Sequence, residues 1–306
     1  MRSARRSFLV LGAIVLGFLP VEVAAEPAGR LIDGPAGKLY VEVRGTAPGR
    51  PLLIVNGGPG FDHTYLLTSP VWDEIAKARR VVMYDQRGTG RSTAVKPGTP
   101  LTLKDQLADL EAVRKSLGTE EVDLLGHSYG GALVMAYSAR NPDRVKRLLI
   151  IDSAAPKWTE TVFLFNQVYP DVAERMDGFE FGSQFGDVTA IDGGIQQYLQ
   201  MLFWDPQHRD AFLRQFTPGG FRRHVNEVLD ADMAHYDLNP EIKKFRMPVL
   251  VMTGRYDMNV APIVAWKIHK AIPGSRFVVV DRSGHLPFYE EPERFKQVVE
   301  EFLNAR

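Results

Sequence analysis

The chain of 306 residues contains no cysteine. A thiol nucleophile, a disulfide framework and a cysteine-ligated zinc site are therefore all excluded. The seven histidines show no His-Glu-x-x-His pair or comparable ligand spacing. The sequence thus gives no reason to expect a metal or any other cofactor.

An excess of charge of either sign is also lacking, because 37 basic residues balance 37 acidic ones. Proteins that bind nucleic acid or anionic membrane surfaces usually carry a clear basic excess. We therefore expect the partner to be a small molecule or a short peptide, and no nucleic acid. The composition does not define the oligomeric state.

Long hydrophobic runs are absent except near the N-terminus, and the run there is short. Basic residues, including the pair Arg5 and Arg6, precede the apolar stretch Phe8 to Leu19, and Val23-Ala24-Ala25 then offers a cleavage site. We expect residues 1–25 to be a signal peptide, the mature protein to be periplasmic or secreted, and no stable membrane insertion after cleavage. The paired arginines resemble a bacterial twin-arginine signal. A general secretion leader and an uncleaved anchor are the alternatives.

Strand and helix signals alternate along most of the remaining chain. Apolar runs predict buried strands at residues 52–55, 80–84, 122–125, 148–151, 248–254 and 276–280, a half-exposed strand at 38–43, and helices at 103–117 and 132–140. Such alternation predicts an α/β fold, with a mostly parallel sheet covered by helices on both faces. Residues 26–155 and 247–306 would form this catalytic domain.

The alternation stops between residues 156 and 246. This stretch is rich in aromatic residues, its periodicity is helical and broken, and it lies between two predicted strands of the sheet. We expect it to form a mainly helical cap inserted over the active site. Most of its aromatic residues would then form the core of the cap.

The segment Gly126-His127-Ser128-Tyr129-Gly130 has the form Gly-x-Ser-x-Gly. It follows a predicted strand and precedes a predicted helix, which is the context of a nucleophile elbow. In such an elbow the serine adopts a strained backbone conformation that exposes its hydroxyl, and the two glycines leave room for the turn. Ser128 is therefore the predicted nucleophile.

A carboxylate and an imidazole follow later in the chain, each just past a predicted strand. Asp257 comes after residues 248–254 and His285 after residues 276–280. The order Ser, Asp, His is that of α/β-hydrolases, and parallel strands gather such residues at their carboxyl ends. A serine hydroxyl needs a base to take its proton and an acid to orient that base. His285 is the predicted base and Asp257 the predicted acid, with Asp152 as the alternative acid.

Backbone donors for an oxyanion are predicted in two places. Asn56-Gly57-Gly58-Pro59-Gly60 follows the predicted strand 52–55, and the N–H groups of Gly57 and Gly58 can face a developing negative charge. The N–H of Tyr129, directly after the nucleophile, is the other expected donor.

These motifs together resemble the prolyl iminopeptidase branch of the α/β-hydrolases. Members carry His-Gly-Gly-Pro-Gly, then Asp-Gln-Arg-Gly-x-Gly-x-Ser, then the serine elbow, and residues 85–92 match the second motif at every fixed position. We interpret Asp85 and Arg87 within it as structural. This chain differs from the family pattern at Asn56, where histidine is usual, and at His127 and Tyr129, where glycine and tryptophan are common. The preference for proline is therefore left open.

The resemblance implies that acidic residues of the cap hold the free α-amino group of a peptide substrate. The cap carboxylates considered for this role are Glu160, Glu174, Glu180 and Glu227. The expected activity is cleavage of an acyl bond through a seryl acyl-enzyme, with aminopeptidase action on short peptides as the first choice. A carboxylesterase or lactonase, and a ligand receptor that retains the triad, are the alternatives.

Overall fold

The computed structural model describes residues 29–175, 188–216 and 221–305. The predicted signal peptide, at residues 1–25, and Glu180 lie outside the described residues. Within the described part of the chain, no helix is both long and apolar enough to span a membrane.

The centre of the fold is an eight-stranded sheet with the order β1-β2-β4-β3-β5-β6-β7-β8. Only β2 runs against its neighbours β1 and β4, and all other pairs are parallel. The mostly parallel sheet is thus confirmed. The strands are β1 (Gly29–Gly34), β2 (Gly37–Arg44), β3 (Leu52–Val55), β4 (Val81–Tyr84), β5 (Val122–His127), β6 (Val145–Ile151), β7 (Val249–Gly254) and β8 (Arg276–Val280).

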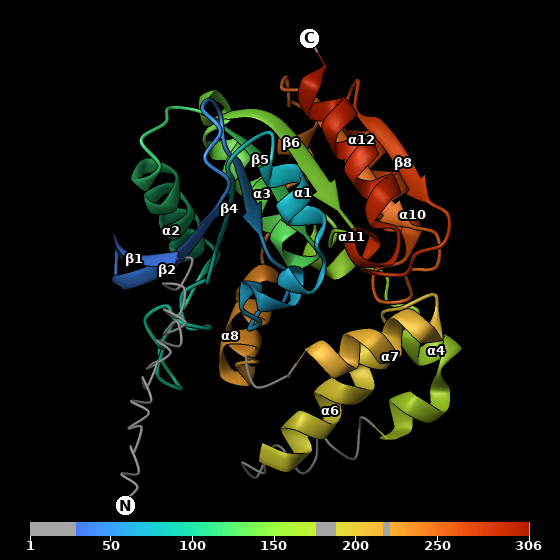
Figure 1. The fold of residues 1–306 in the computed structure, drawn as a ribbon. Coiled ribbons are helices and arrows are strands. Elements are labelled where there is room, and N and C mark those ends of the chain that lie inside the picture. The colour runs from blue at the N-terminus through green and yellow to red at the C-terminus, as the bar shows by residue number, and fades with distance from the viewer. Residues whose placement is uncertain (1–28, 176–187, 217–220, 306) are drawn as a thin grey trace, which may run out of the picture.

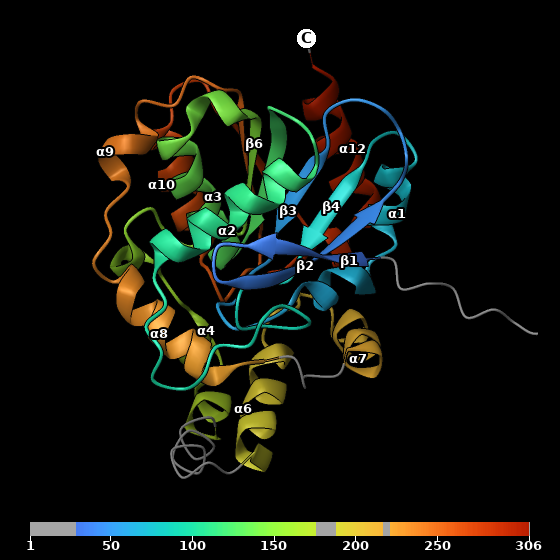
Figure 2. The ribbon, with the colours of Figure 1, turned by 90° about the vertical axis from the view of Figure 1, so that its left-hand side faces the viewer.

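Helices cover both faces of the sheet because alternate strand residues point to opposite sides. In β3, for example, Leu53 and Val55 pack with one set of helices, whereas Leu52 and Ile54 pack with the other. The first set comprises α2 (Leu103–Ser116), α3 (Tyr129–Arg140) and α10 (Pro262–Ala271), and the second comprises α1 (Val71–Ala76) and α12 (Pro292–Asn304). Figure 2 shows α2 and α3 on one side of the sheet and α1 and α12 on the other.

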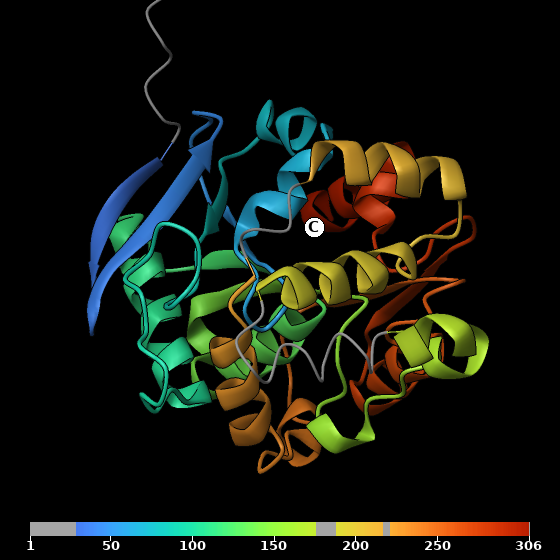
Figure 3. The same ribbon diagram turned by 90° about the horizontal axis from the view of Figure 1, so that it is seen from below.

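A helical segment lies between β6 and β7. Its helices are α4 (Phe165–Val168), α6 (Val188–Gln200), α7 (Pro206–Gln215), α8 (Arg223–Met233) and α9 (Asn239–Ile242). We refer to α4, α6, α7 and α8 as the cap helices. They lie together beyond one end of the sheet (Figure 1), and the view from below shows α6 and α7 crossing that end (Figure 3).

Two features of the N-terminal strands differ from the prediction. The strand β1 was not predicted, because residues 29–34 contain only two apolar side chains, Leu31 and Ile32. The strand β2 was expected to be half-exposed, but four consecutive residues, 39–42, are buried. One reason is local: the Tyr40 ring stacks on the imidazole of His63, with ring centroids 5.8 Å apart.

A buried charged cluster fixes the loop between β3 and α1 to the sheet. His63 begins the 3-10 helix η1 (His63–Thr68); its Nδ1 lies 2.6 Å from Asp85 Oδ1 and its Nε2 lies 3.3 Å from Glu42 Oε2. Burial opposes the charged imidazole, but the hydrogen bonds to Asp85 and Glu42 raise the pKa of His63 to about 9. The bond to His63 in turn lowers the pKa of Glu42 to about 2. His63 is thus an imidazolium held between two carboxylates.

The loop after β4 is held by the two residues interpreted as structural. Asp85 binds His63 through Oδ1, and its Oδ2 accepts from the backbone N–H of Arg91 at 2.8 Å. Arg87 donates two hydrogen bonds to Asp109 of α2, at 2.8 and 2.6 Å. Both side chains therefore fix the position of the loop, and neither lines the pockets beside Ser128.

The His63 cluster predicts a loss of stability at alkaline pH. Because the folded pKa of about 9 exceeds the unfolded value of about 6.5, the stabilisation is complete below pH 6.5 and is lost as the pH rises through 9. We expect the free energy of unfolding to fall by about 3 kcal/mol across this interval. Urea denaturation at a series of pH values measures this change. The His63→Asn variant should be less stable at pH 6.5 and should lack most of the decline; an equal decline in both proteins would refute the assignment.

Candidate active site

Ser128 occupies the turn between β5 and α3, as the elbow motif predicts. Its backbone has φ 58° and ψ −123°, a left-handed conformation that costs a non-glycine residue about 1–3 kcal/mol. A Cβ at Gly126 would lie 2.3 Å from the carbonyl oxygen of Gly130, and one at Gly130 would lie 2.2 Å from that of Val55. The two glycines are therefore required where β3, β5 and α3 come closest.

The side chains of Asp257 and His285 contact each other directly. Asp257 Oδ2 lies 2.7 Å from His285 Nδ1, and its Oδ1 accepts the backbone N–H groups of Asn259 and Val260, both at 2.9 Å. Three donors favour the ionised form of this carboxyl, although burial raises its pKa. Burial also lowers the pKa of the His285 imidazole. The pair is therefore a carboxylate and a neutral base whose Nδ1 carries the proton.

Asp152 lies beside this pair, but it is Asp257 whose carboxylate contacts the His285 ring. Asp152 Oδ1 accepts the N–H of Gly254 at 2.8 Å, and its carboxyl group also interacts with the side chains of Asp257 and Thr253. Burial and the neighbouring Asp257 raise the pKa of Asp152 well above its usual value, so it holds its proton. Asp152, Asp257 and His285 are also the one cluster of metal-ligand type in the described ranges. The bond between Asp257 and His285 occupies atoms that a metal would need.

The two glycines proposed as oxyanion donors have different environments. The N–H of Gly57 donates to Tyr65 Oη at 2.6 Å, so it is already engaged. Within the described residues, no hydrogen bond involves the N–H of Gly58 or of Tyr129. Tyr129 begins α3, and the first N–H groups of a helix have no partner within it. Gly58 and Tyr129 therefore carry the available donors beside Ser128.

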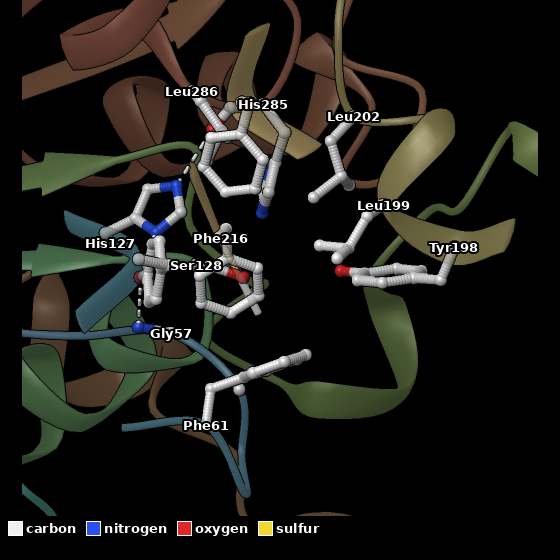
Figure 4. A pocket seen from close by; sticks show the side chains of 13 residues that line it. Gly57, Phe61, His127, Ser128, Tyr198, Leu199, Leu202, Phe216, His285 and Leu286 are labelled. Atoms are coloured by element: carbon white, nitrogen blue, oxygen red, sulfur yellow. Dashed lines mark hydrogen bonds between the residues drawn. The ribbon is translucent and has the colours of Figure 1, made fainter. Parts of the chain in front are cut away.

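A directed chain of hydrogen bonds runs behind the nucleophile. Burial and the neighbouring His285 lower the pKa of His127 well below its usual value, so its ring is neutral. Its Nε2 lies 2.8 Å from the carbonyl oxygen of His285 and must donate. Its Nδ1 must then accept from Tyr65 Oη, 2.7 Å away. The Gly57 N–H donates to the Tyr65 hydroxyl, which donates to the His127 ring, which donates to the His285 carbonyl. These three bonds connect the glycine loop to the loop of His285 (Figure 4).

Asn56, which replaces the histidine usual in the family, is fully buried and folds the glycine loop. Its Nδ2 donates to the carbonyl oxygens of Gly57 and Phe61, both at 2.9 Å, and Gln86 donates to its backbone oxygen at 2.9 Å. It lines neither pocket beside Ser128. Asn56 therefore acts on the substrate only through the shape of the loop.

Ser128 stands between two compartments beneath the cap helices. The small compartment has a volume of about 30 Å³ and the large compartment about 300 Å³, and Ser128, Gly58, Phe61 and Tyr198 line both. His285 lies in the small compartment among aliphatic and aromatic side chains, and Figure 4 shows Leu199, Leu202 and Phe216 around it. The large compartment is further lined by aromatic side chains of the segment after β6, and by Asn226, Asp230 and Asn259.

The three predicted acidic residues of the cap that lie in the described ranges do not line these compartments. Glu160 is exposed beside Lys157, and Glu227 is exposed and pairs with Arg223 at 2.7 Å. Glu174 is also exposed. The acidic side chain that lines the large compartment is Asp230, which no pattern in the sequence singles out.

A buried carboxylate joins the loop of the base to the cap. Glu290 accepts the backbone N–H groups of Gly284, Trp204 and Asp205, at 2.6, 2.8 and 3.1 Å, and burial raises its pKa to about 7. The N–H of His285 also donates to the carbonyl of Leu202 at 2.7 Å. Hydrogen bonds thus attach the loop that carries His285 to the segment between α6 and α7.

Known proteins resemble this chain in sequence over most of its length. A family model described as alpha/beta hydrolase fold matches residues 50–292. A proline iminopeptidase of Saccharolobus solfataricus is 31% identical over 279 residues, which cover 87% of this chain and 88% of that protein. A proline iminopeptidase of Heyndrickxia coagulans is 28% identical over 274 residues, covering 84% and 91%.

Solved structures of an esterase and a lactonase have the same fold. A thermophilic esterase from Thermogutta terrifontis matches with a TM-score of 0.69 and 25% identity, covering 90% of this chain and 97% of that one. An enol-lactonase from Burkholderia xenovorans matches with a TM-score of 0.70 and 21% identity, covering 90% and 100%, which shows the fold alone. From the family match and the curated relatives, the chain belongs to the α/β-hydrolase fold family and, within it, to the proline iminopeptidase-like branch.

Proposed function

We propose that the protein is a serine aminopeptidase that removes an N-terminal residue from short peptides through a seryl acyl-enzyme. The observation that carries this proposal is the carboxylate of Asp230 in the large compartment beside Ser128. The names of the curated relatives support it.

The proposed reaction assigns one role to each of these groups. His285 Nε2 takes the proton of Ser128 as Oγ attacks the carbonyl carbon, while Asp257 stabilises the resulting imidazolium. The carbonyl electron pair moves to oxygen, where the N–H groups of Gly58 and Tyr129 stabilise it. His285 then gives the proton to the leaving amine. Water hydrolyses the ester by the same steps.

Asp230 is suited to hold the ammonium group of a peptide. Trp158 Nε1 donates to its Oδ1 at 2.7 Å and thereby orients the carboxylate. Among the described residues that line the large compartment, Asp230 is the only acidic one, and no basic residue is present. A positive charge is therefore the group that this compartment attracts, which favours an aminopeptidase over a simple esterase.

The size of the large compartment favours side chains bulkier than proline. Its volume of about 300 Å³ lies at the lower end of the range for small-molecule sites. Its aromatic lining residues are Phe61, Trp158, Phe163, Phe165, Tyr198 and Phe221. We propose that large apolar N-terminal residues are accepted at least as well as proline.

We also propose that residues 156–246 act as a cap domain.

Residues 1–25 are proposed to direct export and then to be cleaved. The basic residues and the apolar stretch of this leader support the proposal. N-terminal sequencing of the exported protein tests it, with Glu26 as the expected first residue. An intact leader on the exported protein would contradict cleavage.

The ammonium site can be tested with free and N-acetylated forms of phenylalanyl, prolyl and alanyl p-nitroanilides. The Asp230 side chain is exposed in the described structure, and an exposed ion pair contributes about 1 kcal/mol, so kcat/KM should be about fivefold higher for the free forms. Asp230→Asn should remove most of this preference. Glu227→Gln, one turn earlier on the same helix and outside the lining of the compartment, is the matched control and should keep it, and Ser128→Ala should abolish turnover.

Equal rates on free and acetylated substrates would refute the aminopeptidase. Activity confined to simple p-nitrophenyl esters would instead favour the esterase. Preference for the free amine without preference for proline would support both the ammonium site and the broad aromatic compartment. Strict preference for the prolyl substrate would retain the peptidase but contradict the proposed role of the aromatic compartment.

The two buried acids should differ in their effect on catalysis. Asp257→Asn removes the acceptor of His285 Nδ1–H, so kcat should fall by ~10⁴, the size of the effect when a triad acid is neutralised. Asp152 already holds a proton, and an amide resembles a neutral carboxyl, so Asp152→Asn should lower kcat by less than ~10-fold. Steady-state kinetics of both folded variants measures this, and the reverse ranking would make Asp152 the acid.

A further inference from the structure

The atom that must accept the proton of Ser128 already has a hydrogen-bond partner. His285 Nε2 lies 3.1 Å from Nδ2 of Asn259. Nδ1 of the same ring carries the proton, because it faces the carboxylate of Asp257 at 2.7 Å. Nε2 therefore presents a lone pair, and only the NH₂ side of the Asn259 amide can meet it, because the carbonyl side would place two acceptors together.

The lone pair of His285 Nε2 cannot accept the proton of Ser128 while it accepts a hydrogen bond from Asn259. The ring nitrogen has one lone pair and accepts one strong hydrogen bond. No hydrogen bond joins Ser128 to His285 in the described structure, although both residues line the small compartment. While the amide of Asn259 donates to the base, the base cannot take the serine proton.

The backbone of Asn259 is fixed in place, whereas its side chain is accessible from the large compartment. Its backbone N–H is fixed on Asp257 Oδ1 at 2.9 Å. Its amide lines the large compartment and interacts with Tyr198 of the cap helix α6. The amide can therefore rotate about its side-chain bonds while the acid remains in place, and an acyl group entering this compartment contacts it.

We propose that Asn259 is a positioning residue that occupies the catalytic base until an acyl group fills the large compartment. An acyl group with a hydrogen-bond acceptor, such as a peptide carbonyl, would take the amide donor and leave Nε2 free for Ser128. The proton still passes from Ser128 Oγ to His285 Nε2 as the bond from Oγ to carbon forms, and Asn259 transfers none. This inference rests on the proposed serine mechanism but does not require the ammonium site.

The test compares a small serine reagent with a substrate that fills the compartment. A p-nitrophenyl methylphosphonate ester forms a bond to Ser128 without occupying the large compartment. With Asn259→Ala, we expect its second-order rate of labelling at neutral pH to rise about tenfold, the effect of releasing one hydrogen bond. The kcat/KM for the phenylalanyl anilide should not rise in parallel, because that substrate already displaces the amide.

The pH profile separates this role from a structural one. A donor on Nε2 favours the neutral ring, so Asn259→Ala should raise the apparent pKa of the base in the labelling reaction. Asn259→Asp supplies a carboxylate that favours the imidazolium, so it should raise that pKa further and slow labelling at neutral pH. Asn259→Ala should thus speed labelling and Asn259→Asp should slow it, while both raise the pKa of the base. This combination is expected only if the side chain of residue 259 acts on Nε2 of His285.

The control is Asn239→Ala on α9, which lines neither compartment and should change neither quantity. Thermal melting of all variants establishes that they fold. An unchanged labelling rate and an unchanged pKa in folded Asn259→Ala would overturn the inference. Failure of the native protein itself to be labelled at Ser128 would overturn the serine mechanism and the inference together, whereas loss of the ammonium preference alone would affect neither.

Discussion

The active site depends on the strained turn between β5 and α3. Ser128 has a positive φ there, and the turn closes only because Gly126 and Gly130 allow two backbones to pass at distances that no Cβ would tolerate. This conformation places Ser128 directly before the first N–H of α3, which is the proposed oxyanion donor, and at the boundary of both compartments. Strain of this kind persists only where the surrounding structure fixes it.

The fixing groups come from loops that are far apart in the sequence. His127 and Tyr65 connect the glycine loop to the loop of His285, and the buried His63 holds the same glycine loop on β2 and on Asp85. Glu290 attaches the loop of the base to the segment between α6 and α7. Hydrogen bonds therefore connect the glycine loop, the loop of His285 and the segment between α6 and α7, so a change in the cap is expected to reach the base.

The sequence predicted those parts of the site that follow from local pattern. Runs of apolar residues located six of the strands, and Ser128, Asp257 and His285 follow because each comes soon after a strand of a parallel sheet. The glycine motif located the oxyanion loop. It did not show which N–H is free, because the partner of Gly57 is a tyrosine eight residues later, in the 3-10 helix η1, which was not predicted.

Side chains without a periodic signal were not predicted. Asp230 lies on α8 only one turn beyond Glu227, and both side chains are exposed, yet only Asp230 lines the compartment. Asn259 follows Asp257 in an irregular turn, and its contact with His285 requires the packing of β7 against β8. Such contacts depend on tertiary packing, so composition and residue spacing do not predict them.

The most direct test of the proposed catalytic site is a crystal structure of the protein with Ser128 trapped by a phenylalanine-derived α-aminophosphonate. We expect the phosphonyl oxygen to accept the N–H groups of Gly58 and Tyr129 while Gly57 still donates to Tyr65. The ammonium group should lie against Asp230, with the phenyl ring in the large compartment. A phosphonyl oxygen bound by Gly57, with Tyr65 displaced and the ammonium group away from Asp230, would contradict the proposed site.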